Sequence, residues 1–233
     1  MESKLRKMFE TQYEVNVVAA GKNWISGFSK DNRRLNYARA IYMEAIELID
    51  SYPWKWWKNI NQEPDISNAQ IEAIDIWHFL MSLVSLEVKY RGEDKNSIIK
   101  NSVSFYMNNM KFKDSFKDLS VIEISEHIAK HAITLSSSSD LEERKVALRL
   151  LIGAFEALNE TLLNGKLIEI YNGKSILNKF RQDNGYRNNT YIKVWNGKED
   201  NVYMLELITQ KNISNDSLYE ELDKIYKTIN NLS

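Results

Sequence analysis

Two short stretches decide the fold: residues 41–49 read IYMEAIELI and residues 71–77 read IEAIDIW. Each stretch carries two carboxylates three positions apart within an otherwise apolar run, and these are Glu44 with Glu47 and Glu72 with Asp75. Side chains three positions apart share one face of an α-helix, and a helix that is apolar nearly all round is mostly buried. The pattern therefore predicts two buried helices, each of which projects a pair of carboxylates to one side.

The composition of the whole chain favours an all-α helical bundle. With 233 residues, of which 43% are apolar, the chain can form one large domain or two small ones, and we treat residues 1–233 as a single domain. Only 8 glycines and 2 prolines are present, too few for the many tight turns of a β-sandwich or barrel. A net charge of −1 argues against bulk binding of nucleic acid or of an anionic membrane. The absence of cysteine excludes disulfides, thiolate catalysis and cysteine-bound zinc.

Apolar residues recur at helical spacing along almost the entire chain. Gly21 is suited to end the first helix, because glycine readily adopts the left-handed conformation of a helix C-terminus. Asp31 or Asn32 can cap a second helix that runs to about Asp50. The chain is therefore expected to begin with two helices, one that ends at Gly21 and one that starts at Asp31 or Asn32.

The third helix is predicted to begin at Ser67, which has Gln70 three positions later in the spacing of a capping box. It should reach Tyr90 and stop at Gly92. Further helices are predicted at about residues 95–112, 117–134, 141–163, 168–181, 199–210 and 214–230, with an irregular segment at 185–200. No glycine-rich phosphate-binding loop is evident, so phosphates would have to be bound by metals and cationic side chains.

The four carboxylates indicate a metal site. Negative charges that face one another in a partly desolvated site repel strongly, and they are tolerated only when protonated, paired with cations or bound to metal. All-oxygen ligands favour hard cations, so the expected ion is Mg²⁺, with two or three ions when a triphosphate also binds. The plainer alternative is a solvated helix face. A ferritin-like di-iron site is the rival metal site, but Asp75 and His78 give one partial match to its motif, without the second copy that such a site needs.

The order of these motifs resembles a known superfamily. An E-x-x-E pair, 24 intervening residues and an E-x-x-D pair are typical of the all-α nucleoside triphosphate pyrophosphohydrolases. Three further blocks are similar to the dimeric dUTPases of that superfamily: Gln12 and Asn16 followed by Asn23-Trp24, the run 42–59 continued at 75–79, and the run 173–186 continued at 191–201. The resemblance implies the all-α NTP pyrophosphatase fold, with the site built from residues 12–79 and 173–201 and with residues 93–160 as helical scaffold.

The resemblance also implies a function, that of a dUTP diphosphatase. Such an enzyme hydrolyses dUTP to dUMP and pyrophosphate, which lowers dUTP and supplies dUMP for thymidylate synthesis. It would use Glu44, Glu47, Glu72 and Asp75 as Mg²⁺ ligands, and we assign Glu47 to orient or deprotonate the attacking water. We expect a cytoplasmic homodimer that acts on dUTP, with dUDP as a candidate second substrate, and no nucleic-acid or membrane partner. Two alternatives stay open: a related pyrophosphohydrolase with dCTP or broad base preference, and a non-catalytic helical interaction protein.

Two polar sets are expected to bind the nucleotide. Lys174, Asn178 and Arg181 lie at i, i+4 and i+7, which is one helical stripe suited to a phosphate chain. Gln12 and Asn16 lie one helical turn apart, and their amides can donate to and accept from the uracil edge. The full set predicted to bind substrate is Gln12, Asn16, Trp54, Trp57, Lys58, His78, Lys174, Asn178, Arg181, Tyr186 and Lys193. The plainer alternatives are a solvated basic face for the stripe, an exposed polar face for the amides and core packing for the tryptophans.

Three expectations concern the surroundings of the third helix. Trp77 is expected to pack in the core. His78, one turn beyond Asp75, is expected to support a metal ligand rather than bind metal itself. Residues 71–86 are apolar on more faces than the core of one chain readily covers, and excess apolar surface usually marks an interface. This last pattern predicts that the helix contributes to a dimer contact.

Overall fold

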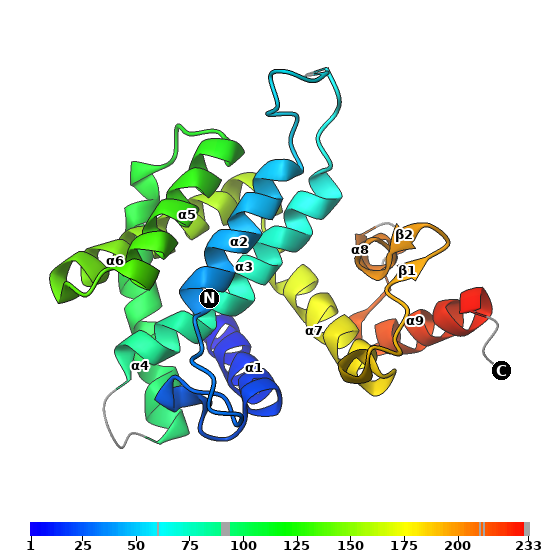
Figure 1. Cartoon of the computed structure of the whole chain (residues 1–233), viewed down its shortest axis with the longest axis horizontal. Coiled ribbons are helices and arrows are strands. Elements are labelled where there is room, and N and C mark those ends of the chain that lie inside the picture. The colour runs from blue at the N-terminus through cyan, green and yellow to red at the C-terminus, as the bar shows by residue number, and fades with distance from the viewer. Residues whose placement is uncertain (60, 90–93, 210, 212, 231–233) are drawn as a thin grey trace. The chain divides into compact units, whose positions relative to one another are not determined.

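The computed structural model of the chain describes residues 1–59, 61–89, 94–209, 211 and 213–230. The described chain consists of helices, loops and two short strands, so the prediction of an all-α fold is confirmed. It separates into two compact units, Met1–Asn164 and Gly165–Ser233 (Figure 1). The boundary is a turn in which Asn164 and Gly165 have φ of 45° and 81°. That the chain acts as a single domain stays a prediction.

The described part of the first unit consists of helices joined by loops. In chain order its elements are α1 (Glu2–Ala20), η1 (Trp24–Ser26), α2 (Tyr37–Asp50), α3 (Ile66–Val88), α4 (Lys95–Asn109), η2 (Met110–Ser115), α5 (Val121–Ser137), α6 (Leu141–Leu158) and η3 (Asn159–Leu163). α2 packs against both α3 and α5, and α5 packs against α6. The helix that carries the first acidic pair is therefore held by two long neighbours.

An aromatic cluster lies in the core of the first unit. The ring of Trp77 stacks on Phe155 with 5.1 Å between centroids and an interplanar angle of 12°, and Tyr106 and Phe9 meet it edge-on. Both geometries are favoured for aromatic pairs, and they fix α3 against α6, α4 and α1. Trp77 is fully buried, so the prediction that it packs in the core is confirmed.

The start of α2 differs from the prediction. The helix begins at Tyr37, where the side chain of Asn36 accepts a hydrogen bond from the backbone N–H of Arg39. The predicted cap at Asp31 or Asn32 was therefore wrong. Asn32 lies in a turn with φ of 57°, whereas a capping residue adopts an extended conformation with negative φ.

The start of α3 also has a different cap from the one predicted. Asp65 is the N-cap, and its side chain accepts a hydrogen bond from the backbone N–H of Asn68 at 2.9 Å. Ser67 and Gln70 lie within the helix, so the predicted capping box was wrong. Asp65 caps well because its carboxylate both accepts a hydrogen bond and interacts favourably with the positive end of the helix dipole.

The ends of two helices also refine the prediction. α3 ends at Val88, and Lys89 has an extended backbone with φ of −65° and ψ of 145°, so the prediction that the helix reaches Tyr90 was wrong. The predicted stop at Gly92 lies outside the described residues. The helix expected over residues 141–163 keeps regular α-helical geometry as far as Leu158 and then continues as one π-helical turn, η3.

The second unit packs three helices around its own core. They are α7 (Leu167–Asp183), α8 (Asp200–Thr209) and α9 (Asn215–Asn230), and α7 contacts both of the others. A short η4 (Tyr186–Asn188) follows α7. The buried core cluster consists of Leu177, Phe180, Trp195, Met204, Leu207, Ile208, Leu218, Leu222 and Tyr226.

The segment predicted to be irregular contains a short β-hairpin. β1 (Val194–Trp195) and β2 (Lys198–Glu199) pair antiparallel. The turn residues Asn196 and Gly197 have φ of 46° and 81°, the positive values that a two-residue hairpin turn requires. Asn-Gly is a strong sequence signal for such a turn, so this hairpin was predictable from that dipeptide.

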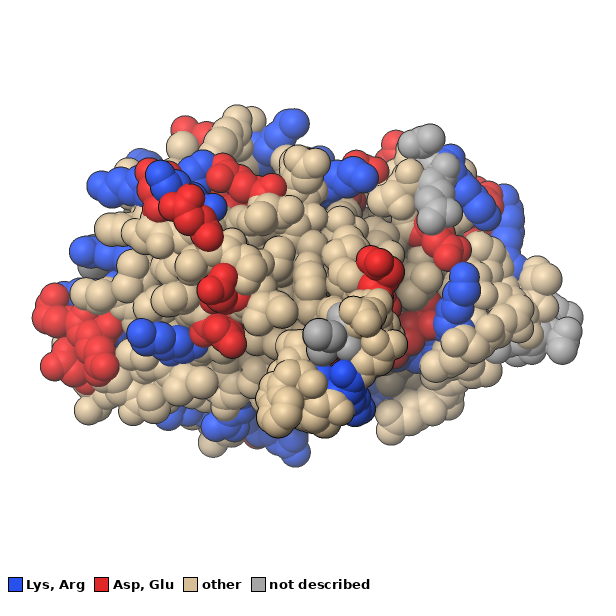
Figure 2. Space-filling model, turned by 90° about the horizontal axis from the view of Figure 1, so that it is seen from above, with Lys and Arg blue, Asp and Glu red and all other residues tan. Residues whose placement is uncertain are grey.

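One argument for a dimer concerns the apolar faces of α3. Every aliphatic side chain of α3 from Ile71 to Val84 is buried within the single chain, whereas Leu86 is half-buried. The core of one chain therefore covers most of the predicted excess, and a dimer contact by this helix stays a prediction. Elsewhere on the surface, acidic and basic side chains are interspersed on the face that Figure 2 shows. None of the described helices is both long enough and apolar enough to cross a membrane.

A stability test follows from two helical glycines. A Cβ added at Gly153 would lie 2.7 Å from the carbonyl carbon and 2.8 Å from the carbonyl oxygen of Phe112, so backbone would have to move. At Gly173 the added Cβ would meet the flexible ends of Ile208 and Met204. We expect Gly153→Ala to lower the free energy of unfolding by about 2 kcal/mol, more than Gly173→Ala does, in urea unfolding experiments. An equal or larger loss in Gly173→Ala would contradict this account.

Candidate functional site

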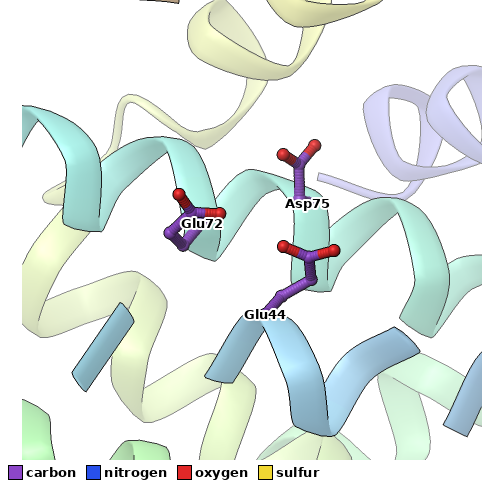
Figure 3. A group of neighbouring side chains, drawn as sticks. All are labelled: Glu44, Glu72 and Asp75. Atoms are coloured by element: carbon purple, nitrogen blue, oxygen red, sulfur yellow. The ribbon is translucent and has the colours of Figure 1, made fainter. Parts of the chain in front are cut away.

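Three carboxylates come together where α2 packs against α3. Glu44 reaches from α2 toward Glu72 and Asp75, which lie one turn apart on α3 (Figure 3). One carboxylate oxygen from each of the three lies within 4.8 Å of the others. The group contains oxygen ligands alone and is able to hold a metal ion. The structure thus brings together three of the four predicted carboxylates.

Burial and mutual repulsion shift the proton affinity of this group. Burial is the largest cause that raises the pKa of Glu44 from 4.5 to about 8, and the charges of Asp75 and Glu72 raise it further. A hydrogen bond with Glu72 and the charge of Glu47 act in the same direction. Glu44 is therefore largely protonated at neutral pH in the metal-free protein, and a bound cation would displace that proton.

Glu47 lies outside the group of three. Its side chain is exposed, and the described carboxylates that meet within 4.8 Å do not include it. A helical residue three positions along is rotated by about 60° around the axis, so Glu44 can face α3 while Glu47 turns toward solvent. Its charge still raises the pKa of Glu44. The roles of Glu47 as a metal ligand and as the residue that orients water stay predictions.

A buried polar network begins one turn along α3 from Asp75. His78 Nδ1 lies 2.7 Å from Gln12 Oε1, and Gln12 Nε2 donates to Asn16 Oδ1 and to Ser82 Oγ, both at 3.2 Å. Asn16 Nδ2 donates to the same hydroxyl at 2.9 Å. All four side chains are buried, so the two amides of α1 do not form an exposed polar face.

The tryptophans of the loop between α2 and α3 are exposed rather than buried in the core. The rings of Trp54 and Trp57 meet edge-on at 5.5 Å between centroids. Trp54 Nε1 donates to Asp50 Oδ1 at 3.1 Å, and Lys55 donates to the same oxygen, so the end of α2 holds the start of this loop. Lys58 is exposed. The assignment of these side chains to a base pocket stays a prediction.

In the second unit the predicted basic stripe is built around a buried carboxylate. Arg181 Nε and Nη2 donate to the two oxygens of Asp200 at 2.7 Å each, and Asp200 is fully buried. Asn201 Oδ1 accepts from Arg181 Nη2 at 2.9 Å and from Lys174 Nζ at 3.1 Å. Arg181 Nη1 also donates to Asn178 Oδ1 at 3.3 Å. The stripe is therefore a hydrogen-bonded assembly and not a solvated basic face.

Two more of the predicted residues lie near this assembly. The ring centroid of Tyr186 is 5.9 Å from Arg181 Cζ, within the range of a cation–π contact. Lys193 forms an exposed ion pair with Glu199 at 2.9 Å. Exposed pairs contribute little free energy, so Lys193 can exchange Glu199 for another anion.

Ser82 and Asp200 are two residues of these networks that were not predicted from the sequence. Ser82 accepts hydrogen bonds from both amides of the network, and its sequence signal was one hydroxyl in a long apolar helical run. Asp200 binds Arg181 and also accepts a hydrogen bond from the Tyr191 hydroxyl at 2.7 Å. In the sequence, Asp200 was marked only by its place in the run 191–201, which is similar to the dimeric dUTPases. Neither signal identifies the partner, because the partners come from distant positions in the chain.

The metal-free protein should lose stability as the pH rises. Between pH 4.5, the ordinary pKa, and about 8, the pKa in the folded state, the folded chain holds the Glu44 proton more tightly than the unfolded chain. Ionisation over this range therefore favours unfolding. We expect the urea midpoint, measured with a chelator, to fall between pH 5 and pH 8.

The matched variants are Glu44→Gln and Glu126→Gln, the latter an exposed glutamate on α5. Glu44→Gln should remove much of the fall in urea midpoint with pH, because it replaces the carboxyl that titrates, whereas Glu126→Gln should retain the fall. Saturating Mg²⁺ should raise the midpoint at pH 8 in the unmodified chain by mass action. A fall of the same size in Glu44→Gln would show that another group causes it.

Comparison with known proteins adds one finding to this geometry. A sequence profile of the family described as dUTPase matches residues 4–186. The matched span contains the acidic group of α2 and α3, the buried amide network and the stripe on α7. No curated protein matches the chain.

Proposed function

Because the chain belongs to the all-α, dimeric dUTPase family and is therefore an enzyme that hydrolyses dUTP, we propose that it does so through a magnesium site. The predicted ligands are Glu44, Glu47, Glu72 and Asp75, with two or three ions per site, and the products are dUMP and pyrophosphate. The observation that carries the proposal is the acidic group, whose three carboxylate oxygens lie within 4.8 Å of one another.

The residues of the acidic group fit a hard divalent cation. Carboxylate oxygens are the preferred ligands of Mg²⁺, and the group contains no histidine, which favours magnesium over a ferritin-like iron site. Burial and the neighbouring charges of Asp75 and Glu72 raise the pKa of Glu44, which supports the proposal that a cation binds there. Binding of a cation would release the Glu44 proton and offset the repulsion from Glu72 and Asp75.

Each carboxylate then has a task in the reaction. When bound, Mg²⁺ supplies positive charge for the phosphate oxygens and lowers the pKa of water. Glu44, Glu72 and Asp75 would hold that ion and so set its position relative to α2 and α3. To Glu47, which is exposed and lies outside this group of three, we assign the orientation of the attacking water and the acceptance of its proton.

We assign the phosphate chain to the stripe of the second unit. Lys174 and Arg181 both donate to Asn201 Oδ1, so their relative positions are set before a substrate binds. Groups held in this way lose little conformational entropy on binding. The residues assigned to the phosphates are Lys174, Asn178, Arg181, Tyr186 and Lys193.

We assign the base to the first unit. The amides of Gln12 and Asn16, held by His78, offer donors and acceptors in a buried environment, where a mispaired polar group is costly. The exposed side chains of Trp54, Trp57 and Lys58 are assigned to cover the base.

Membership of this family also bears on how the chain assembles and where in the cell it acts. We propose a homodimer that acts in the cytoplasm, where it would act on dUTP and, as a second candidate, dUDP. Met43 and Ile46 on α2 support the dimer, because they are 45% and 48% exposed and lie three positions apart on one helix face. A second chain could cover this apolar pair.

The reaction is tested by pyrophosphate release from dUTP, dTTP and dCTP, with Mg²⁺ or with a chelator. We expect dUTP to be preferred and the chelator to abolish turnover. Glu72→Gln and Glu47→Gln should each lower kcat by about 10²-fold or more, the scale for losing one group that stabilises developing charge. Glu126→Gln is the control and should retain full activity.

Two results of that assay would count against the proposal. Full activity of Glu72→Gln would remove the acidic group from the mechanism. Equal rates on dUTP and dCTP would leave hydrolysis intact but point to the broader base preference that the sequence left open.

Assembly is tested by light scattering and specific activity over a dilution series. We expect a mass of twice 27.3 kDa at high concentration and a loss of specific activity as the dimer dissociates on dilution. A mass near 27.3 kDa with full specific activity would show that one chain suffices.

A further inference from the structure

Ser82 connects the two amides of α1 to α3. Its side chain is 1% exposed. The hydroxyl oxygen accepts from Gln12 Nε2 at 3.2 Å and from Asn16 Nδ2 at 2.9 Å, and the hydroxyl donates to the backbone carbonyl of His78 at 2.9 Å. One serine is therefore shared by both side chains that are assigned to the base.

The direction of these hydrogen bonds follows from their chemistry. The His78 carbonyl can only accept, so it takes the single hydrogen of the Ser82 hydroxyl; the other acceptor within reach, Asn16 Oδ1, is more distant at 3.3 Å. With its hydrogen committed, the hydroxyl oxygen can only accept. The amide atoms nearest to it are the nitrogens, Gln12 Nε2 at 3.2 Å and Asn16 Nδ2 at 2.9 Å, and these two bonds set the orientation of both amides.

His78 completes the constraint on Gln12. Because the Gln12 nitrogen faces Ser82, the Gln12 oxygen faces His78 Nδ1 at 2.7 Å, and Nδ1 must carry the hydrogen of that bond. Both hydrogens of Gln12 Nε2 are used, one on Ser82 and one on Asn16 Oδ1. Gln12 thus orients Asn16, and Asn16 keeps one N–H and one oxygen lone pair for a ligand.

The orientation of such an amide decides which base it can pair with. Uracil and cytosine differ at one edge by the exchange of a donor and an acceptor. An amide presents N–H beside C=O, so a rotation by 180° converts a complement of one base into a complement of the other. An amide that rotates could pair with both, whereas an amide held in one orientation leaves buried groups mispaired with the wrong base.

We infer that Ser82 is a positioning residue that determines base specificity, because it holds the amide of Asn16, both directly and through Gln12, in the orientation that pairs with uracil and not with cytosine. This inference rests on the proposed function, in which the two amides read the base. Ser82 itself need not touch the nucleotide. Its effect should appear as selectivity and not as a loss of turnover.

The test compares Ser82→Ala with Ser85→Ala. Ser85 lies on the same helix, is 5% exposed and likewise donates to the carbonyl four residues before it, that of Met81, at 3.0 Å. Its side-chain partner is Ser102 at 3.2 Å, outside the amide network. The two variants therefore remove the same group from similar surroundings, and their urea midpoints report the purely structural cost of each.

We expect the ratio of kcat/KM for dUTP to kcat/KM for dCTP to fall about tenfold in Ser82→Ala, the scale of one hydrogen bond, and to stay unchanged in Ser85→Ala. Ser82→Thr keeps a hydroxyl and should retain the ratio. If Ser82→Ala does not fold, Ser82→Cys replaces it, because a thiol is similar in size but a weak donor and acceptor, and its ratio should also fall.

The outcomes separate this inference from the function on which it rests. An unchanged ratio, or an equal fall in kcat/KM for both nucleotides, would overturn the role of Ser82 while leaving dUTP hydrolysis in place. A wild-type enzyme that does not distinguish dUTP from dCTP would instead overturn the assignment of Gln12 and Asn16 to the base.

Discussion

The repulsion among Glu44, Glu72 and Asp75 is the constraint on which the rest of the first unit depends. Three carboxyl groups whose oxygens lie within 4.8 Å destabilise a metal-free fold, and their charges add to burial, the largest cause, in raising the pKa of Glu44. The surrounding core holds them together nonetheless. α2 is packed by α3 and α5, and α3 is fixed by the aromatic contacts of Trp77. A scaffold this well packed keeps the carboxylates in place, so a cation meets a site that is already assembled.

α3 also carries a buried polar network, whose groups attract one another. The carboxylates repel one another, whereas Ser82, His78 and the α1 amides hold one another by hydrogen bonds. A hydrogen-bonded buried network is rigid, and a group of like charges responds strongly to ions. One turn of α3 separates the two, which places a metal-responsive group beside a rigid polar one. In the proposed function, the acidic group serves the phosphate chemistry and the polar network serves recognition of the base.

Periodicity predicted the helices well, but local competition and distant contacts limited the rest. Caps were misplaced because several Asp, Asn and Ser residues near each helix start can serve equally, and the final choice depends on the path of the loop, as for Asn36 and Asp65. Spacing indicated that two acidic pairs would meet, but the rotation of α2 about its axis, which turns Glu47 away, is set by packing against α3 and α5. The pairing of Arg181 with Asp200 spans 19 positions, and no local pattern encodes such a contact.

In the second unit, the cation Arg181, which is assigned to the phosphates, forms an ion pair with the buried carboxylate of Asp200. Asp200 neutralises the charge of Arg181, so net attraction for an anion is reduced at that residue. The ion pair instead orients the Arg181 side chain, because a bidentate contact fixes the plane of the guanidinium. Loss of either partner would leave an uncompensated buried charge. Asn201 also positions Lys174, because its Oδ1 accepts hydrogen bonds from both Lys174 and Arg181. In both units, then, the side chains assigned to the nucleotide are held by a second residue, Ser82 in one and Asp200 in the other, and recognition depends on fixed orientation more than on total charge.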